Sequence, residues 1–86
     1  MPRALTMREA RHAGGERHRF LAAARERRAR YAREHCNYWV FEDVSAAGDF
    51  VEFVEARDAD TLGAALLAES GSGAAAPRVF REVELD

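Results

Sequence analysis

Five side chains of types that bind or activate small molecules are spread along this chain: Arg8, Asn37, Trp39, Glu52 and Glu82. A carboxylate in a partly apolar pocket has a raised pKa and acts as a general base, whereas a neighbouring arginine lowers that pKa and favours a fixed ion pair. Two interpretations follow. Either Glu52 is a catalytic base and Asn37 a catalytic hydrogen-bond donor, or Arg8, Glu52 and Glu82 form an ion network that fixes dimer register.

Trp39 belongs to the first of two runs, residues 37–43 and 50–55, that are rich in aromatic and β-branched residues. Two such runs joined by a short loop predict a β-hairpin. If Glu42 lies across from Asp49, then Trp39 lies across from Glu52 on the same face of the sheet.

Further elements are indicated on both sides of the hairpin. Residues 4–11 alternate loosely and predict a strand, while residues 16 to about 35 lack glycine and proline and predict a helix. Asp58 or Asp60 would begin a second helix that ends near residue 69, followed by a flexible connection over residues 70–77 and a last strand over residues 78–85. The apolar residues expected on the core side of the helices are Phe20, Leu21, Ala24, Tyr31 and Ala32 in the first and Ala59, Leu62, Ala65 and Leu66 in the second.

This order of elements predicts one α+β domain over residues 1–86 with the ferredoxin-like βαββαβ arrangement. Such a sheet has four antiparallel strands in the order four, one, three, two, and both helices cover one face. Alternation predicts that the side chains facing the helices are Leu5, Met7, Tyr38, Val40, Val51, Phe53, Val79 and Val83. The side chains expected to face away are Thr6, Arg8, Asn37, Trp39, Phe41, Glu52, Val54, Phe80 and Glu82.

The face turned away from the helices would carry both the pocket and an interface. Arg8 would lie between Glu52 and Glu82, with Trp39 and Phe41 forming the wall of a pocket for a small planar or acidic molecule. A monomer would leave an apolar patch in water, made by Trp39, Phe41, Val54 and Phe80. We therefore expect a homodimer formed by sheet-to-sheet packing about a two-fold axis.

Composition excludes several classes of protein. The 86 residues contain no run long enough to span a membrane and begin without a secretory apolar segment, so we expect a soluble, cytoplasmic protein. Cys36 is the single cysteine, which rules out an internal disulfide, and with three scattered histidines it makes no zinc site. We expect a buried free thiol, no metal and no cofactor. A catalytic pair of Cys36 with His35 is disfavoured, because adjacent residues rarely point together.

The charges are distributed unevenly. Residues 1–35 hold ten arginines and four glutamates, a net charge of +6, whereas residues 36–86 hold three arginines and eleven acids, a net charge of −8. An arginine-rich helix alone would suggest nucleic-acid binding. The acidic half of so small a domain would repel phosphate, so we expect no nucleic-acid partner and a solvated basic helix instead.

Taken together, the strand at residues 5–8, the long first helix, the run Asn37-Tyr38-Trp39-Val40-Phe41-Glu42, the strand at 50–55, the second helix and the last strand resemble the antibiotic-biosynthesis-monooxygenase-like family. The similarity is one of layout over nearly the whole chain, without a diagnostic motif. It implies a dimeric α+β barrel whose pocket lies between sheet and helices or near the barrel mouth. Family members include cofactor-independent oxygenases, haem-degrading enzymes and proteins without known activity.

The resemblance implies two candidate functions. In the first, a cofactor-free monooxygenase holds a small aromatic or quinol-like substrate with Trp39 and Phe41, Asn37 binds its oxygen, and Glu52 removes a proton. In the second, a dimeric ligand-binding or accessory protein performs no chemistry. Active members tend to carry a histidine in the second helix, and residues 61–69 contain none, so haem ligation is not expected. The identity of a substrate and assembly beyond a dimer do not follow from the sequence.

Overall fold

The computed structural model describes residues 2–12, 14–70 and 77–85 of the chain. Its elements follow in the order β1 (Ala4–Arg11), α1 (Glu16–Arg33), β2 (Asn37–Glu42), β3 (Asp49–Ala56), α2 (Ala59–Ser70) and β4 (Val79–Arg81). The predicted α+β class, with two helices and a four-stranded antiparallel sheet, is confirmed. Most of the expected connection at residues 70–77 falls on residues 71–76, which lie outside the described residues.

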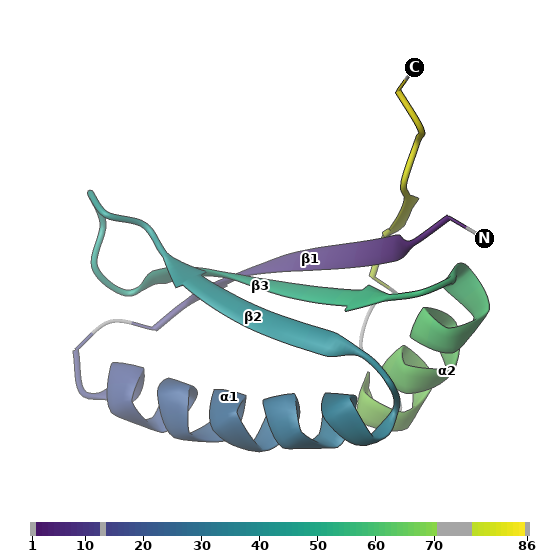
Figure 1. Cartoon of the computed structure of the whole chain (residues 1–86). Helices are drawn as coiled ribbons and strands as arrows, with labels where there is room; N and C mark the ends of the chain where they lie inside the picture. The colour runs from purple at the N-terminus through teal and green to yellow at the C-terminus, as the bar shows by residue number, and fades with distance from the viewer. Residues whose placement is uncertain (1, 13, 71–76, 86) are drawn as a thin grey trace.

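The strands lie side by side in the order β2-β3-β1-β4, so β2 and β4 are the edges of the sheet. Both helices lie against one face, and the other face carries no helix (Figure 1). We call these the helix-covered face and the open face. The C-terminal segment leaves the sheet on the open side and points away from the helices (Figure 1).

Helix α1 buries one stripe of side chains against the sheet: Phe20, Ala24 and Tyr31. The helix ends in a Schellman motif, in which Cys36 N donates to Tyr31 O at 2.9 Å and His35 N donates to Ala32 O at 3.1 Å. His35 adopts φ 63°, the left-handed conformation that this motif requires and that glycine usually supplies. The chain continues from this motif directly into β2, and Cys36, the residue before β2, is buried.

Helix α2 begins at an acidic cap and packs through small residues. Asp58 Oδ1 accepts a hydrogen bond from Thr61 N at 2.7 Å, which confirms one of the two predicted caps. Leu62 and Ala65 are fully buried, whereas Ala59, expected in the core, is exposed. The small side chains of Ala4 and Ala56 on the sheet belong to the same core cluster, so α2 approaches the sheet closely there.

The hairpin register differs by one residue from the predicted one. Glu42 lies across from Phe50 rather than Asp49, and Trp39 lies across from Phe53 rather than Glu52. A shift of one residue turns every side chain of a strand to the opposite face. Glu52 and Val54 are therefore buried on the helix-covered face, contrary to the prediction.

The face assignment for β1 was also wrong. Thr6 is buried on the helix-covered face, whereas Met7 lies across from Phe53 on the open face. Near α2, β1 presents the small residues Ala4 and Thr6 to the helices, whereas its larger apolar residues Leu5 and Met7 lie on the open face. The apolar residues of the open face are Leu5, Met7, Trp39, Phe41, Val51, Phe53 and Phe80.

Strand β4 is three residues long, shorter than the predicted strand over residues 78–85. Its residues lie across from Ala4–Thr6 of β1, and Pro77, which has no N–H to donate, precedes it. After Arg81, one further backbone bond is found within the described part of the chain, from Glu82 N to Arg3 O at 2.8 Å. Because β4 runs antiparallel to β1, the residues after Glu82 lie beyond the first residue of β1. Val83 is therefore 74% exposed instead of buried. Among the described residues, neither helix is long and apolar enough to cross a bilayer.

Candidate functional site

A cluster of polar side chains lies between the sheet and α1, where an apolar core would be expected. It consists of Arg8 from β1, Arg27 from α1, Tyr38 from β2 and Glu52 from β3, and we call it the Glu52 cluster. The Glu52 side chain is only 4% exposed. The sheet brings these residues together, because Arg8 of β1 and Val40 of β2 lie across from Glu52 on its two neighbouring strands. Tyr38 is two residues before Val40 and therefore lies on the same face of the sheet.

Both carboxylate oxygens of Glu52 accept hydrogen bonds. Tyr38 Oη donates to Oε1 at 2.5 Å, and Arg27 Nε donates to the same oxygen at 3.1 Å. Arg8 donates to Oε2 from Nη2 at 3.0 Å and from Nε at 3.2 Å. A buried carboxylate held in this way is fully satisfied, which is the condition under which burial of a charge is tolerated.

These partners decide the protonation states in the cluster. Burial alone would raise the pKa of Glu52, but the hydrogen bonds from Tyr38 and Arg8 and the charges of Arg27 and Arg8 outweigh it and lower that pKa. Burial, together with the hydrogen bond to Glu52, raises the pKa of Tyr38 to about 12. The cluster therefore holds an ionised glutamate, a neutral tyrosine and two guanidinium groups, with a net charge of +1.

Arg27 carries donor capacity that the described residues do not use. Its Nη2 lies 2.9 Å from Glu52 Oε1, an electrostatic contact that lacks hydrogen-bond geometry, and this buried nitrogen has no hydrogen-bond partner among the described residues. The Arg8 side chain is 65% exposed, and Glu52 is its one hydrogen-bond acceptor among the described residues. Two cationic groups thus face one carboxylate.

A cavity of about 50 Å³ adjoins the cluster. The four members of the cluster line it together with Thr6, Tyr31, Val54, Leu66 and Pro77. Tyr31 stacks on Tyr38 with ring centroids 5.6 Å apart, which adds an aromatic wall. A partly open space of this size holds a few water molecules or a group of similar size, such as a carboxylate.

The remaining predicted site residues lie apart from this cluster. Trp39 and Phe41 are on the open face, 45% and 58% exposed, so the sheet separates them from Glu52. Asn37 Nδ2 donates to Glu55 Oε1 at 2.9 Å, at one end of the sheet. The prediction that Arg8 lies across from Glu52 is confirmed, but on the helix-covered face rather than the open one.

Glu82 does not join Arg8 as predicted. Its carboxylate accepts bonds from Arg3 Nη2 at 2.7 Å and Arg3 Nε at 3.1 Å, because β4 pairs with the opposite end of β1. The hydrogen bond from Arg3 lowers the pKa of Glu82. The two predicted glutamates therefore belong to separate ion pairs.

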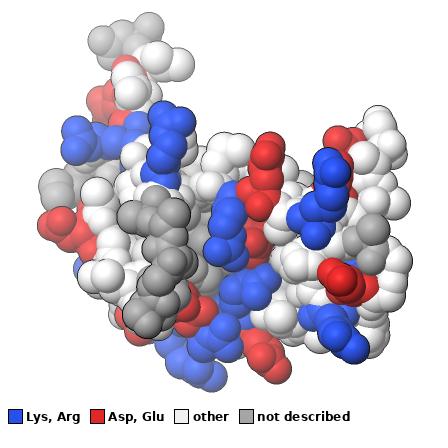
Figure 2. Space-filling model, turned by 180° about the vertical axis from the view of Figure 1, so that it is seen from behind, with Lys and Arg blue, Asp and Glu red and all other residues white. Residues whose placement is uncertain are grey.

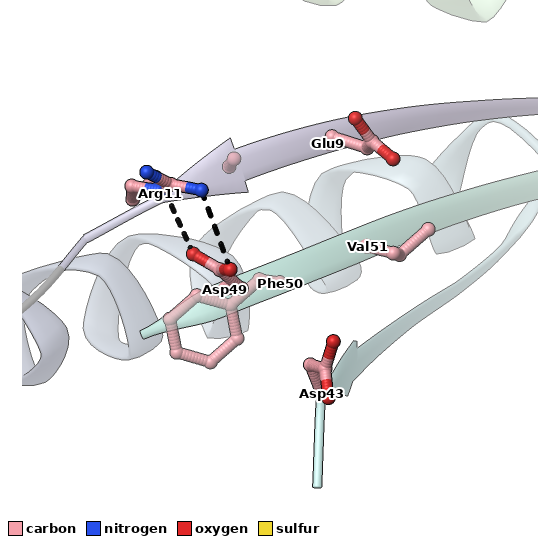
Figure 3. A pocket seen from close by; sticks show the side chains of 7 residues that line it. Glu9, Arg11, Asp43, Asp49, Phe50 and Val51 are labelled. Carbon is pink, nitrogen blue, oxygen red and sulfur yellow. Dashed lines mark hydrogen bonds and ion pairs between the residues drawn. The ribbon is translucent and has the colours of Figure 1, made fainter. Parts of the chain in front are cut away.

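A larger hollow of about 360 Å³ lies beside the loop of the hairpin (Figure 3). Asp49 accepts a hydrogen bond from Arg11 Nε at 2.8 Å there, and Glu9 and Asp43 also line the hollow. Phe50, its aromatic member, is only 2% exposed and packs against Phe20 in the core. The polar lining of this hollow is three carboxylates and one arginine that is already paired with Asp49, so we place the candidate site at the Glu52 cluster.

Some of the surface arginines are paired with acidic side chains, whereas Arg25 and Arg28 on α1 have no such partner among the described residues. Figure 2 shows acidic and basic side chains side by side over much of the face seen from behind, with a group of basic side chains toward its lower edge. On α1, Arg17 and Arg30 bind Glu42 and Glu69. Within the described part of the chain, no group of three or more His, Cys, Asp or Glu residues is arranged to hold a metal ion.

Sequence reasoning missed Arg27 and Tyr38 as members of the site. The basic helix was expected to be solvated, yet the spacing of Phe20, Ala24, Arg27 and Tyr31 by four, three and four residues places Arg27 within the apolar stripe. An arginine at such a position indicates a buried acidic partner. Tyr38 joins Glu52 only once the hairpin has its true register.

Comparisons with known proteins add no relative. No family model matches the chain, and searches of curated proteins and of solved structures give no significant match.

Proposed function

We propose that the protein is a homodimeric binding protein for a small carboxylate, held in the cavity beside the Glu52 cluster. The observation that carries this proposal is the excess of cationic donors: Arg8 and Arg27 surround a single carboxylate, and Arg27 Nη2 has no hydrogen-bond partner among the described residues. Guanidinium groups bind carboxylates through paired, charge-assisted hydrogen bonds. A carboxylate beside Arg27 would neutralise the net charge of the cluster.

The shape of the cavity supports a small ligand. Its volume of about 50 Å³ accommodates a carboxylate, and apolar walls from Val54, Leu66 and Pro77 suit a short hydrocarbon or aromatic body. The proposed ligand class is thus a small monocarboxylic acid with an apolar body.

The homodimer is part of the same proposal. The apolar open face would be covered by the open face of a second copy, as in the dimeric α+β barrel of the ferredoxin-like type. Phe41 contacts Phe53 edge-on with centroids 5.5 Å apart, and next to them Trp39, Phe53 and Met7 lie across from one another on three neighbouring strands. Exposed apolar patches of this kind mark interaction surfaces.

A monooxygenase acting on a small aromatic or quinol-like substrate is the second function that the resemblance implies. It receives less support, because Glu52 is ionised, accepts hydrogen bonds at both carboxylate oxygens and lies on the opposite face of the sheet from Trp39. A base with a lowered pKa and two arginine partners is a poor proton acceptor at neutral pH. Oxygen uptake with a hydroquinone tests this function directly.

Calorimetric titration with benzoate and with benzamide tests the binding function, because the two ligands differ in charge and match in shape. We expect benzoate alone to bind, and Arg27→Gln to weaken that binding about tenfold or more, since a charged hydrogen bond contributes about 1.5 to 3 kcal/mol. Arg19→Gln changes an exposed arginine of the same helix and is the matched control. Equal heats for both ligands, or unchanged affinity in folded Arg27→Gln protein, would contradict the proposal.

A further inference from the structure

The outer edge of β2 is free and lies beside a groove. Strand β2 pairs only with β3, so the N–H and C=O groups along its other edge have no strand partner among the described residues. A groove of about 290 Å³ runs between this edge and α1. Its lining, which we call the β2 groove, consists of Leu21, Ala24, Arg25, Arg28, Tyr38, Trp39 and Val40.

The β2 groove has two chemical properties that select its occupant. Arg25 and Arg28 are exposed, and among the described residues neither is joined to an acidic side chain, in contrast to Arg17, Arg27 and Arg30 of the same helix. The rest of the lining is apolar or aromatic. A free strand edge beside two unpaired cations and an apolar wall suits an extended segment that alternates acidic and apolar residues.

The chain itself contains such a segment at residues 82–85, Glu-Val-Glu-Leu. Val83 and Leu85 are 74% and 91% exposed, and after the bond from Glu82 N to Arg3 O the segment has no further backbone partner among the described residues. Their own β1 cannot pair with them, because β4 runs antiparallel to β1 and has already passed its first residue, Ala4. We call residues 82–85 the C-terminal segment.

We propose that the C-terminal segment of one copy binds in the β2 groove of a second copy as an added edge strand. The proposal rests on the homodimer proposed above and identifies an additional contact within it. The segment leaves its own sheet on the open side, where the second copy would lie (Figure 1). Its four residues span roughly 13 Å when extended, which fits within the six-residue strand β2.

The side-chain pattern matches the groove on both faces. Along β2, Tyr38 and Val40 face the helices, whereas Trp39 and Phe41 face the open side. An added strand that places Val83 and Leu85 beside Trp39 and Phe41 extends the apolar open face. The same alternation directs Glu84 toward Arg25 and Arg28 on α1. The charged and the apolar side chains of the added strand would then both contact matching side chains of the other copy.

Removal of the segment tests its contribution to dimer affinity. We expect a chain ending at Arg81 to have a dimer dissociation constant about tenfold or more above that of the full chain in sedimentation equilibrium. Arg25→Glu with Arg28→Glu should also weaken the dimer, and adding Glu84→Arg to that variant should restore part of the affinity. Arg19→Glu, outside the groove on the same helix, should have no effect.

Crosslinking tests the location of the segment. In a Cys36→Ala background, a copy with Glu84→Cys is mixed with a copy carrying Arg25→Cys, and a short bismaleimide is added. We expect a covalent pair of the two different copies, and none when Arg19→Cys replaces Arg25→Cys. A wild-type monomer would overturn both the dimer and this contact. A dimer that keeps its affinity without residues 82–86 and gives no selective crosslink would overturn this contact alone.

Discussion

Glu52 is the residue on which the buried polar cluster depends. Three side chains from three different elements donate to its two oxygens, and without it Arg8 and Arg27 would face each other without an intervening negative charge. Removing one member of a buried ion pair leaves the other with its desolvation cost uncompensated. The two roles considered for Glu52, structural ion pairing and catalytic proton transfer, therefore predict opposite results for one substitution.

We expect Glu52→Gln to lower the free energy of unfolding by about 3 kcal/mol, the low end for a broken buried pair because Arg8 is largely exposed. Urea unfolding at matched protein concentration measures the effect. Because the pKa of Glu52 is lowered in the folded state, the wild-type contribution is present above the ordinary glutamate pKa and lost as pH falls through the folded value. The variant should lack this part of the acid dependence.

The control is Glu9→Gln, which changes an exposed glutamate on β1 and should shift stability by no more than about 0.5 kcal/mol. An unchanged urea midpoint for Glu52→Gln, combined with loss of oxygen uptake on a hydroquinone, would instead identify Glu52 as a catalytic base.

At the scale of single elements, the junction between α1 and β2 is held in an unusual backbone conformation. His35 occupies the left-handed position of the Schellman motif, where a side chain carries a steric cost that glycine avoids. The side chain of His35 is exposed, and none of the hydrogen bonds or ion pairs found in the described structure involves it. The junction between α1 and β2 is thus held by backbone hydrogen bonds, although the residue at its left-handed position is not glycine.

We expect His35→Gly to raise the free energy of unfolding by about 1 kcal/mol, because a non-glycine residue in the left-handed region costs about 1 to 2 kcal/mol. Glu34→Gly is the matched control: Glu34 has φ −95°, so glycine there gains no relief and should destabilise the helix end. Thermal and urea unfolding of both variants measure the difference. A destabilised His35→Gly protein would contradict this account.

The sequence predicted the elements better than the faces that they present. The helix α1 and its start at Glu16, an acidic cap of α2 at Asp58 or Asp60 and the pairing of β2 with β3 all followed from residue types. The register did not, because both faces of β3 are similarly apolar: Phe50 and Val54 alternate with Val51 and Phe53. With no polar face to decide, one residue of error in the loop moved Glu52 to the wrong side of the sheet.

The candidate site was predicted in part for the same reason. The pair of Arg8 and Glu52 depends only on β1 and β3 lying side by side, and it was found. Tyr38 was expected on the side facing the helices and lies there, but its contact with Glu52, like that of Arg27, depends on the hairpin register, which residue types alone did not decide. Glu82 depends on where β4 begins along β1, which residue types alone did not decide.

At the scale of the whole molecule, the main feature is a sheet with a helix layer on one side only. The larger apolar side chains of β1, Leu5 and Met7, lie on the open face, while the helix-covered face contains the charged Glu52 cluster. A second layer of protein over the open face would give these side chains the burial that they lack in one copy.

We expect the wild-type chain to be a dimer at micromolar concentration and Trp39→Glu to raise its dissociation constant about thirtyfold or more, since loss of a central interface tryptophan typically costs 2 kcal/mol or more. Sedimentation equilibrium measures both proteins. Leu67→Glu is the matched control, because Leu67 is 80% exposed on α2, away from the open face. Val54 would also lie at the interface in the predicted register. Because Val54 is buried on the helix-covered face, Val54→Arg should unfold the chain instead. Equal dissociation constants for wild type and Trp39→Glu would rule out this interface.

The buried Cys36 makes motion at the α1–β2 junction measurable as a rate. Its thiol is 5% exposed, and burial raises its pKa, so both the accessible and the thiolate forms are scarce in the closed structure. Alkylation must then wait for the junction to open, and its rate reports how often that happens. Because the chain has no other cysteine, the labelling kinetics of the unmodified protein follow this one opening event.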